Sequence, residues 1–149
     1  MNVAERLESD LKAAMKARDD LRIQVLRMLK SDLSYKRIEL GRDLTQDDIV
    51  TTLSTAVKSR KEAGDEYLRG GRADLADKES AEIKIIQEYL PEQLSTEELN
   101  ILVDKTIAET GAITIKDLGA VMKNLMPAVR GRADGKEVNA AVKARLNGK

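Results

Sequence analysis

The feature that most constrains this chain is the spacing of its apolar residues, which recur every three or four positions along most of the sequence. This spacing gathers them on one face of an α-helix, whereas a half-buried strand needs strict alternation of apolar and polar residues. Only residues 112–115 approach such alternation, and four residues without a partner strand do not make a sheet. The sequence therefore predicts an all-α protein.

Start and stop signals divide the chain into seven predicted helices. Thr45 with Asp48 has the spacing of a capping box, in which side chain and backbone bond reciprocally at a helix start. Gly41 suits the left-handed position after a helix. Pro91 ends a helix because the residue before a proline disfavours the helical region. The predicted helices begin near Val3, Asp19, Thr45, Asp74, Ser95, Thr114 and Asp134.

A proline-containing turn at residues 89–94 marks the predicted boundary between two domains. It leaves an N-terminal bundle of four helices over residues 1–91 and a three-helix C-terminal domain over residues 92–149. A domain as small as the second is only marginally stable alone, so we expect it to be steadied by the first domain or by a partner.

Composition argues against most catalytic chemistry. The chain has no histidine and no cysteine, so it lacks the commonest general base, the commonest metal ligand and every thiol. No serine lies in a Gly-x-Ser-x-Gly elbow, and no serine–lysine arrangement stands out. We therefore expect no cofactor and no metal, and we do not expect the isolated chain to be an enzyme.

The location expected from the sequence is the cytoplasm, with no membrane contact. No apolar run approaches the roughly 20 residues that span a bilayer. The first residues lack the basic and then apolar segments of a signal peptide.

Charge is unevenly distributed although the formal net charge is zero. Residues 12–37 contain 8 basic and 3 acidic side chains, and residues 123–149 contain 7 basic and 2 acidic ones. Residues 74–98 reverse the balance, with 2 basic and 8 acidic. The two basic segments are therefore the parts of the chain suited to a polyanion.

Three charged residues interrupt apolar helix faces. Arg60 lies on the apolar stripe of the third predicted helix, and Glu79 and Glu82 lie on that of the fourth. A charge on a buried face is costly unless it is paired, so we predict a structural ion pair between Arg60 and Glu79 or Glu82, with Gly64 allowing close approach. Two glutamates one turn apart also suit a metal, but di-metal bundles add histidine, which this chain lacks.

The loop at residues 130–136 combines two arginines and two glycines immediately before a predicted helix. Free backbone N–H groups, the positive end of the helix dipole and guanidinium groups together suit a phosphate. The alternative is a helix–helix loop whose glycines only satisfy turn geometry. The candidate phosphate contacts in this part of the chain are Lys123, Arg130, Arg132, Lys136, Lys143 and Arg145.

Several motifs, in a specific order and spacing, resemble the GatB/YqeY family over essentially the whole chain. They are Lys61-Glu62-Ala63, Gly70-Gly71-Arg72-Ala73-Asp74-Leu75, Tyr89-Leu90-Pro91-Glu92-Gln93-Leu94, Lys116-Asp117-Leu118-Gly119-Ala120-Val121-Met122 and Gly131-Arg132-Ala133-Asp134-Gly135-Lys136. One departure is Leu118, where many relatives have methionine, and this swap nearly conserves volume.

The resemblance implies a link to tRNA. In that family the C-terminal module is similar to the tail of the B subunit of the tRNA-dependent amidotransferase, which converts mischarged Glu-tRNA or Asp-tRNA to the amide. The tail helps to hold the tRNA. The resemblance also implies a label of carbon–nitrogen ligase with glutamine as amido donor, although this chain has no counterpart of the parts that carry that chemistry.

From residues and resemblance together we predict a non-catalytic, tRNA-associated helical module, with an amidotransferase or another translation protein as a further partner. The alternative is a protein–protein adaptor that uses the acidic fourth helix and the turn around Pro91, without RNA contact. An enzyme that releases ammonia from glutamine by itself ranks last.

Overall fold

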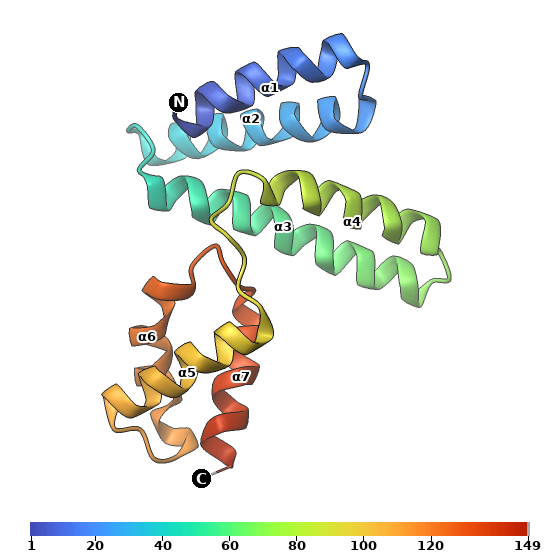
Figure 1. Cartoon of the computed structure of the whole chain (residues 1–149). Coiled ribbons are helices and arrows are strands. Elements are labelled where there is room, and N and C mark those ends of the chain that lie inside the picture. Colours follow the sequence, from blue (N-terminus) through green and yellow to red (C-terminus); the bar gives the residue numbers. More distant parts are fainter. Residues whose placement is uncertain (149) are drawn as a thin grey trace. The chain divides into compact units, whose positions relative to one another are not determined.

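The computed structural model describes residues 1–148, and within them every regular element is helical (Figure 1). The all-α prediction is confirmed. The elements are α1 (Val3–Ala17), α2 (Asp20–Leu40), α3 (Gln46–Arg69), α4 (Ala73–Gln87), α5 (Thr96–Thr110), the short 3-10 turn η1 (Ile115–Asp117), α6 (Leu118–Val129) and α7 (Gly135–Asn147).

Helix ends follow local signals at most positions. The capping boxes of Thr45 and Ser95 are both formed, at the starts of α3 and α5. Gly41 ends α2 in the left-handed conformation at φ 67°, which costs glycine nothing. Arg18 ends α1 in the same conformation at φ 55°, and it is the one non-glycine residue with positive φ in the described part of the chain.

The predicted sixth helix differs at its start. Thr114 does cap a helical turn, and Asp117 completes its capping box, but the turn is the 3-10 segment η1. The α-helix α6 begins only at Leu118. Short 3-10 turns are common at α-helix starts, and sequence patterns do not separate the two.

The chain packs as two compact units, Met1–Pro91 and the residues from Glu92 onward, which we call unit 1 and unit 2. Figure 1 shows unit 1 as two helix pairs, α1 with α2 and α3 with α4. The helix α2 is central because it contacts all three others. The fully buried side chains at the centre of unit 1 are Leu7, Leu26, Leu29, Leu53 and Ile86.

Unit 2 has its own core, made where α5, α6 and α7 each pack against the other two. Its helices contribute apolar residues at three- and four-residue spacing, as the stripe on α6 shows with Val121, Leu125 and Val129. The fully buried residues of this core are Val103, Val121, Leu125, Val129, Val138 and Val142.

Candidate nucleic-acid interface

The loop between α6 and α7 is fixed by the segment that precedes α5. The side-chain amide of Gln93 donates to the carbonyl of Gly131 at 2.7 Å, and the Leu94 N–H donates to the carbonyl of Arg132 at 2.8 Å. Gly131 is buried and has φ 75°, a conformation that favours glycine. We call these two hydrogen bonds the unit 2 clasp. Its effect is to hold the loop in one backbone conformation.

Arg132 also serves this loop, because its guanidinium donates to carbonyls of unit 2. The Nε–H donates to the Glu92 carbonyl at 3.0 Å, and Nη1 donates to the Ala128 carbonyl at 3.4 Å. The structure thus gives Arg132 a packing role that the sequence did not suggest. Its loss affects the loop as well as any bound anion.

We expect Arg132→Ala to lower the free energy of unfolding of unit 2 by about 1 kcal/mol, the usual contribution of such hydrogen bonds. Urea denaturation measures the change, and faster hydrogen exchange at the Leu94 amide locates it. Lys123→Ala is the matched control, because Lys123 is exposed on α6. Equal effects of the two substitutions would show that Arg132 has no packing role.

The start of α7 is already occupied by a carboxylate. Asp134 is the N-cap residue, and its Oδ1 accepts the Lys136 N–H at 3.1 Å. This carboxylate accepts a backbone N–H group and supplies the negative charge that the helix N-terminus favours. A phosphate at this position would have filled the same two roles. Phosphate contact in this region therefore depends on side chains and not on the helix N-terminus.

Helix geometry sorts the remaining candidate cations. Lys123 lies two residues from Val121 and from Leu125, both buried, and so points away from the core. Lys136 and Lys143 are exposed and lie seven residues apart on α7, which places them on one face. The structure thus brings Lys136 and Lys143 together along one helix.

Arg145 is separated from that pair. Its Nε lies 2.8 Å from Oδ1 of Asp104, so the side chain joins α7 to α5 on the other flank of α7. Arg130 is exposed at the end of α6. No local pattern in the sequence indicates the pairing of Arg145 with Asp104, because the two residues lie far apart along the chain.

Unit 1 holds the charged residues that were predicted to pair. Arg60 Nε lies 3.0 Å from Oε2 of Glu82, with only 14% and 15% of the two side chains exposed. Arg60 also donates to the Ala56 carbonyl at 2.8 Å and contacts the sulfur of Met28. Among the described residues, then, the structure joins Arg60 to Glu82 across α3 and α4.

Glu79 lies beside this pair, opposite Gly64 of α3. A Cβ added at Gly64 would lie 3.7 Å from the Glu79 Cβ, so α3 and α4 are in contact here. Burial, followed by the Glu82 charge, raises the pKa of Glu79. Burial also raises the pKa of Asp32 on α2, with Arg60 opposing the shift. We call Asp32, Arg60, Glu79 and Glu82 the Arg60 cluster.

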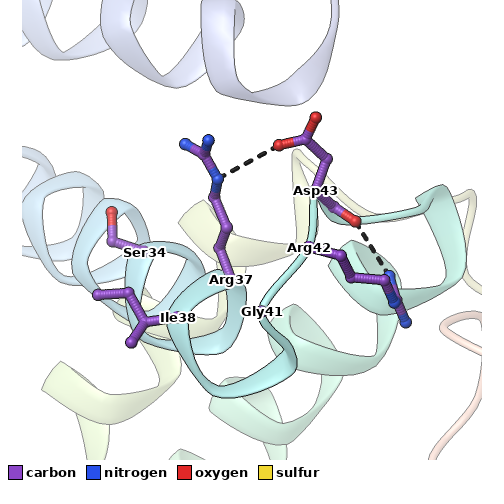
Figure 2. Close-up of a pocket in the computed structure, with 6 residues that line it drawn as sticks. All are labelled: Ser34, Arg37, Ile38, Gly41, Arg42 and Asp43. Atoms are coloured by element: carbon purple, nitrogen blue, oxygen red, sulfur yellow. Dashed lines mark hydrogen bonds and ion pairs between the residues drawn. The ribbon is translucent and has the colours of Figure 1, made fainter.

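A surface depression of unit 1 also contains arginines (Figure 2). Arg37 Nε lies 3.3 Å from Oδ1 of Asp43, and Arg42 Nη1 lies 2.6 Å from Oδ2 of Asp48. The hydrogen bond from Arg42 holds the pKa of Asp48 well below its usual range. Because both guanidinium groups are paired with carboxylates, this depression offers an anion little net attraction.

In residues 1–148, no group of three or more histidine, cysteine, aspartate or glutamate side chains could hold a metal ion. No helix in that range combines the length and the apolar character that crossing a bilayer requires.

Comparison with known proteins identifies the family. Residues 4–146 match the Yqey-like protein family. Among curated relatives, "Altered inheritance of mitochondria protein 41, mitochondrial" of Lachancea thermotolerans is 40% identical over 85 residues, covering 56% of this chain and 46% of that protein. The protein of the same name in Vanderwaltozyma polyspora is 34% identical over 121 residues, covering 75% of this chain and 64% of that protein.

The chain spans less than two thirds of the length of these relatives. Their names place them in mitochondria, and this is a statement about those proteins. The family match extends over nearly all of this chain and includes the helices of both units. The chain therefore belongs to the Yqey-like protein family.

Proposed function

We propose that this chain is a non-catalytic helical module that associates with tRNA through phosphate contacts from unit 2. The observation that carries the proposal is the set of exposed cations on α6 and α7. Lys123 and Lys143 are exposed and form no ion pair within residues 1–148, and Lys143 shares a face with Lys136. Charges that unit 2 does not use internally are available to a polyanion.

The chemistry of the chain suits structured RNA. It has three tyrosines and no phenylalanine or tryptophan, so stacking on unpaired bases has few residues to use. Folded RNA is recognised largely by shape, phosphate and 2′-hydroxyl contacts, which require no aromatic platform. The resemblance of the C-terminal module to an amidotransferase tail favours tRNA among folded RNAs.

The six candidate residues differ in whether unit 2 uses their side chains internally. Lys123 and Lys143 are the primary phosphate contacts in this proposal, and Lys136 at the start of α7 and Arg130 at the end of α6 are exposed further contacts. Arg132 and Arg145 come second, because one holds carbonyls of unit 2 and the other pairs with Asp104. Lys136 and Lys143 lie about 10 Å apart along the axis of α7, so each meets a different phosphate.

The test is binding of the intact protein to total tRNA at about 50 and about 200 mM salt. Affinity that depends on phosphate contacts falls steeply over this range. We expect saturable, salt-sensitive binding. Replacing Lys136 and Lys143 with alanine is expected to reduce the slope of log affinity against log salt by about two, roughly one for each phosphate contact.

The control variant replaces Lys58 and Lys84, two exposed lysines of unit 1, with alanine. It removes the same charge from the molecule, so an equal effect would mean that only net charge matters. A flat salt response in the parent protein would contradict the proposal. In that event the protein–protein adaptor becomes the favoured function. Its test is recovery of a stable protein partner that stays bound after nuclease treatment.

Two finer expectations accompany this proposal. One is a cytoplasmic location, which cell fractionation tests directly. The other is a second partner, an amidotransferase or another translation protein, which is expected to co-purify with the tagged chain. Release of ammonia from glutamine by the purified chain alone would overturn the non-catalytic part of the proposal.

A further inference from the structure

The α1–α2 hairpin carries cations that unit 1 does not pair. Half of the 8 basic residues within residues 12–37 form ion pairs, and these are Arg22 with Glu88, Lys30 with Glu8, Lys36 with Glu39 and Arg37 with Asp43. The other half are exposed: Lys12, Lys16, Arg18 and Arg27. Within the described range, Lys16, Arg18 and Arg27 make no ion pair and no side-chain hydrogen bond. Lys12 acts on Glu8, where its charge is the smallest of the causes that lower that pKa.

The ion pair of Glu8 with Lys30 shows where these cations lie. It joins α1 to α2, which run antiparallel in Figure 1. Lys12 is one turn after Glu8, and Arg27 is one turn before Lys30. Because the two helices are antiparallel, both residues lie on the same side of this ion pair along the hairpin. Lys16 follows one turn further. We call Lys12, Lys16 and Arg27, together with Arg18 at the C-cap of α1, the basic edge.

Two features of the basic edge cost stability. Lys12 and Lys16 are like charges four residues apart on α1, an arrangement that disfavours a helix by a few tenths of a kcal/mol. Arg18 holds the left-handed conformation that Gly41 and Gly111 adopt at the ends of α2 and α5. A glycine would end α1 without that strain, so an arginine at this position costs stability.

We propose that the basic edge is a second phosphate-binding surface, through which unit 1 contacts the same folded RNA that unit 2 binds. This inference rests on the proposed function and adds a contact from the other unit. Phosphates of RNA suit the edge better than a lipid surface does. The reason is that Met15 is the only large apolar residue exposed on α1. An interfacial helix needs a broad apolar face beside its cations.

The experiment uses the intact protein and total tRNA. Replacing Lys12 and Lys16 with glutamine removes two charges and keeps good helix formers. We expect the slope of log affinity against log salt to fall by about two, so that between 50 and 200 mM salt the parent loses about tenfold more affinity than the variant. The double variant of Lys58 and Lys84 to glutamine is the matched control and is expected to follow the parent.

Arg18→Gly separates binding from folding. Glycine relieves the left-handed backbone, so we expect the melting temperature to rise while tRNA affinity falls. A loss of binding caused by misfolding would move both quantities downward. Higher stability with unchanged affinity would overturn the role assigned to Arg18.

The outcomes distinguish the two proposals. If the parent binds tRNA, the Lys136 and Lys143 variant weakens binding and the basic-edge variant does not, then only the basic edge is wrong. If the parent does not bind tRNA at either salt concentration, the proposed function itself fails. Binding of the parent to phosphatidylserine vesicles through Lys12 and Lys16, without tRNA binding, would assign the edge to a lipid surface and overturn the inference.

Discussion

Replacing Arg60 with alanine is expected to lower the free energy of unfolding of unit 1 by about 3 kcal/mol, the range found when a buried ion pair loses one partner. Arg60 is the cation that faces Glu82 within the Arg60 cluster, and both side chains are mostly buried. Without it, Glu82 keeps the neighbouring charge of Glu79 and loses its own ion-pair partner. Urea denaturation of the parent and the variant at pH 7 measures the loss.

The loss is expected to depend on pH. The folded-state pKa values of Glu79 and Asp32 are raised above their ordinary 4.5 and 3.8. A raised carboxyl pKa stabilises the fold below its ordinary value, and that contribution disappears as pH rises through the folded value. Burial is the first cause of both shifts and the Arg60 charge opposes both, so removing Arg60 raises these pKa values further. The deficit of Arg60→Ala should therefore be smaller near pH 4.5 than at pH 7.

Two further variants isolate the charge. Lys58→Ala lies on the same helix at an exposed position and is expected to change stability by less than about 0.5 kcal/mol. Adding Glu82→Gln to Arg60→Ala removes the unpaired carboxylate and should recover part of the loss. A deficit of equal size at both pH values, with no recovery, would mean that Arg60 acts only through the packing of its side-chain stem.

The second large effect is expected in unit 2. Leu125 is 1% exposed, and truncating such a leucine to alanine typically costs about 3 kcal/mol because a cavity remains. The single hydrophobic core of a domain of this size contributes only about 3–5 kcal/mol. Leu125→Ala should therefore unfold unit 2 in part at 25 °C. Amide hydrogen exchange followed by NMR measures protection in each unit separately.

The selective result follows from the separate cores of the two units. We expect Leu125→Ala to reduce protection on α5, α6 and α7 while α2 and α3 keep theirs. Leu26→Ala is the reciprocal variant, since Leu26 is fully buried in unit 1. Loss of protection in both units from either substitution would contradict independent cores.

Much of the fold could be predicted because its signals are local. A capping box such as that of Thr45 occupies four consecutive residues, and the glycine at position 41 marks a helix end by its own conformational freedom. Arg60 could be noted for a related reason, since a charge on an apolar stripe is visible in the sequence. Which glutamate it meets depends on how α3 and α4 pack, and the sequence left Glu79 and Glu82 as alternatives.

The candidate interface was harder to predict because its contacts are distant or involve the backbone. The partners of Arg132 are carbonyls of Glu92 and Ala128, and a carbonyl gives no sequence signal. Asp134 was different. The aspartate before Gly135 was used to place the helix start, and the same observation implied that the N-terminus already carries a carboxylate. The consequence for phosphate binding could have been drawn from the sequence.

The unit 2 clasp also bears on the order in which the chain folds during its synthesis. Gln93 emerges from the ribosome well before its partner Gly131, so the segment before α5 waits, unsecured, until the loop after α6 has been made. The α1–α2 hairpin has no such delay, because its helices are joined by a short turn and pack on each other directly. We expect unit 1 to fold while unit 2 is still being translated, and any ligand of unit 2 to find its surface complete only after α7 has been made.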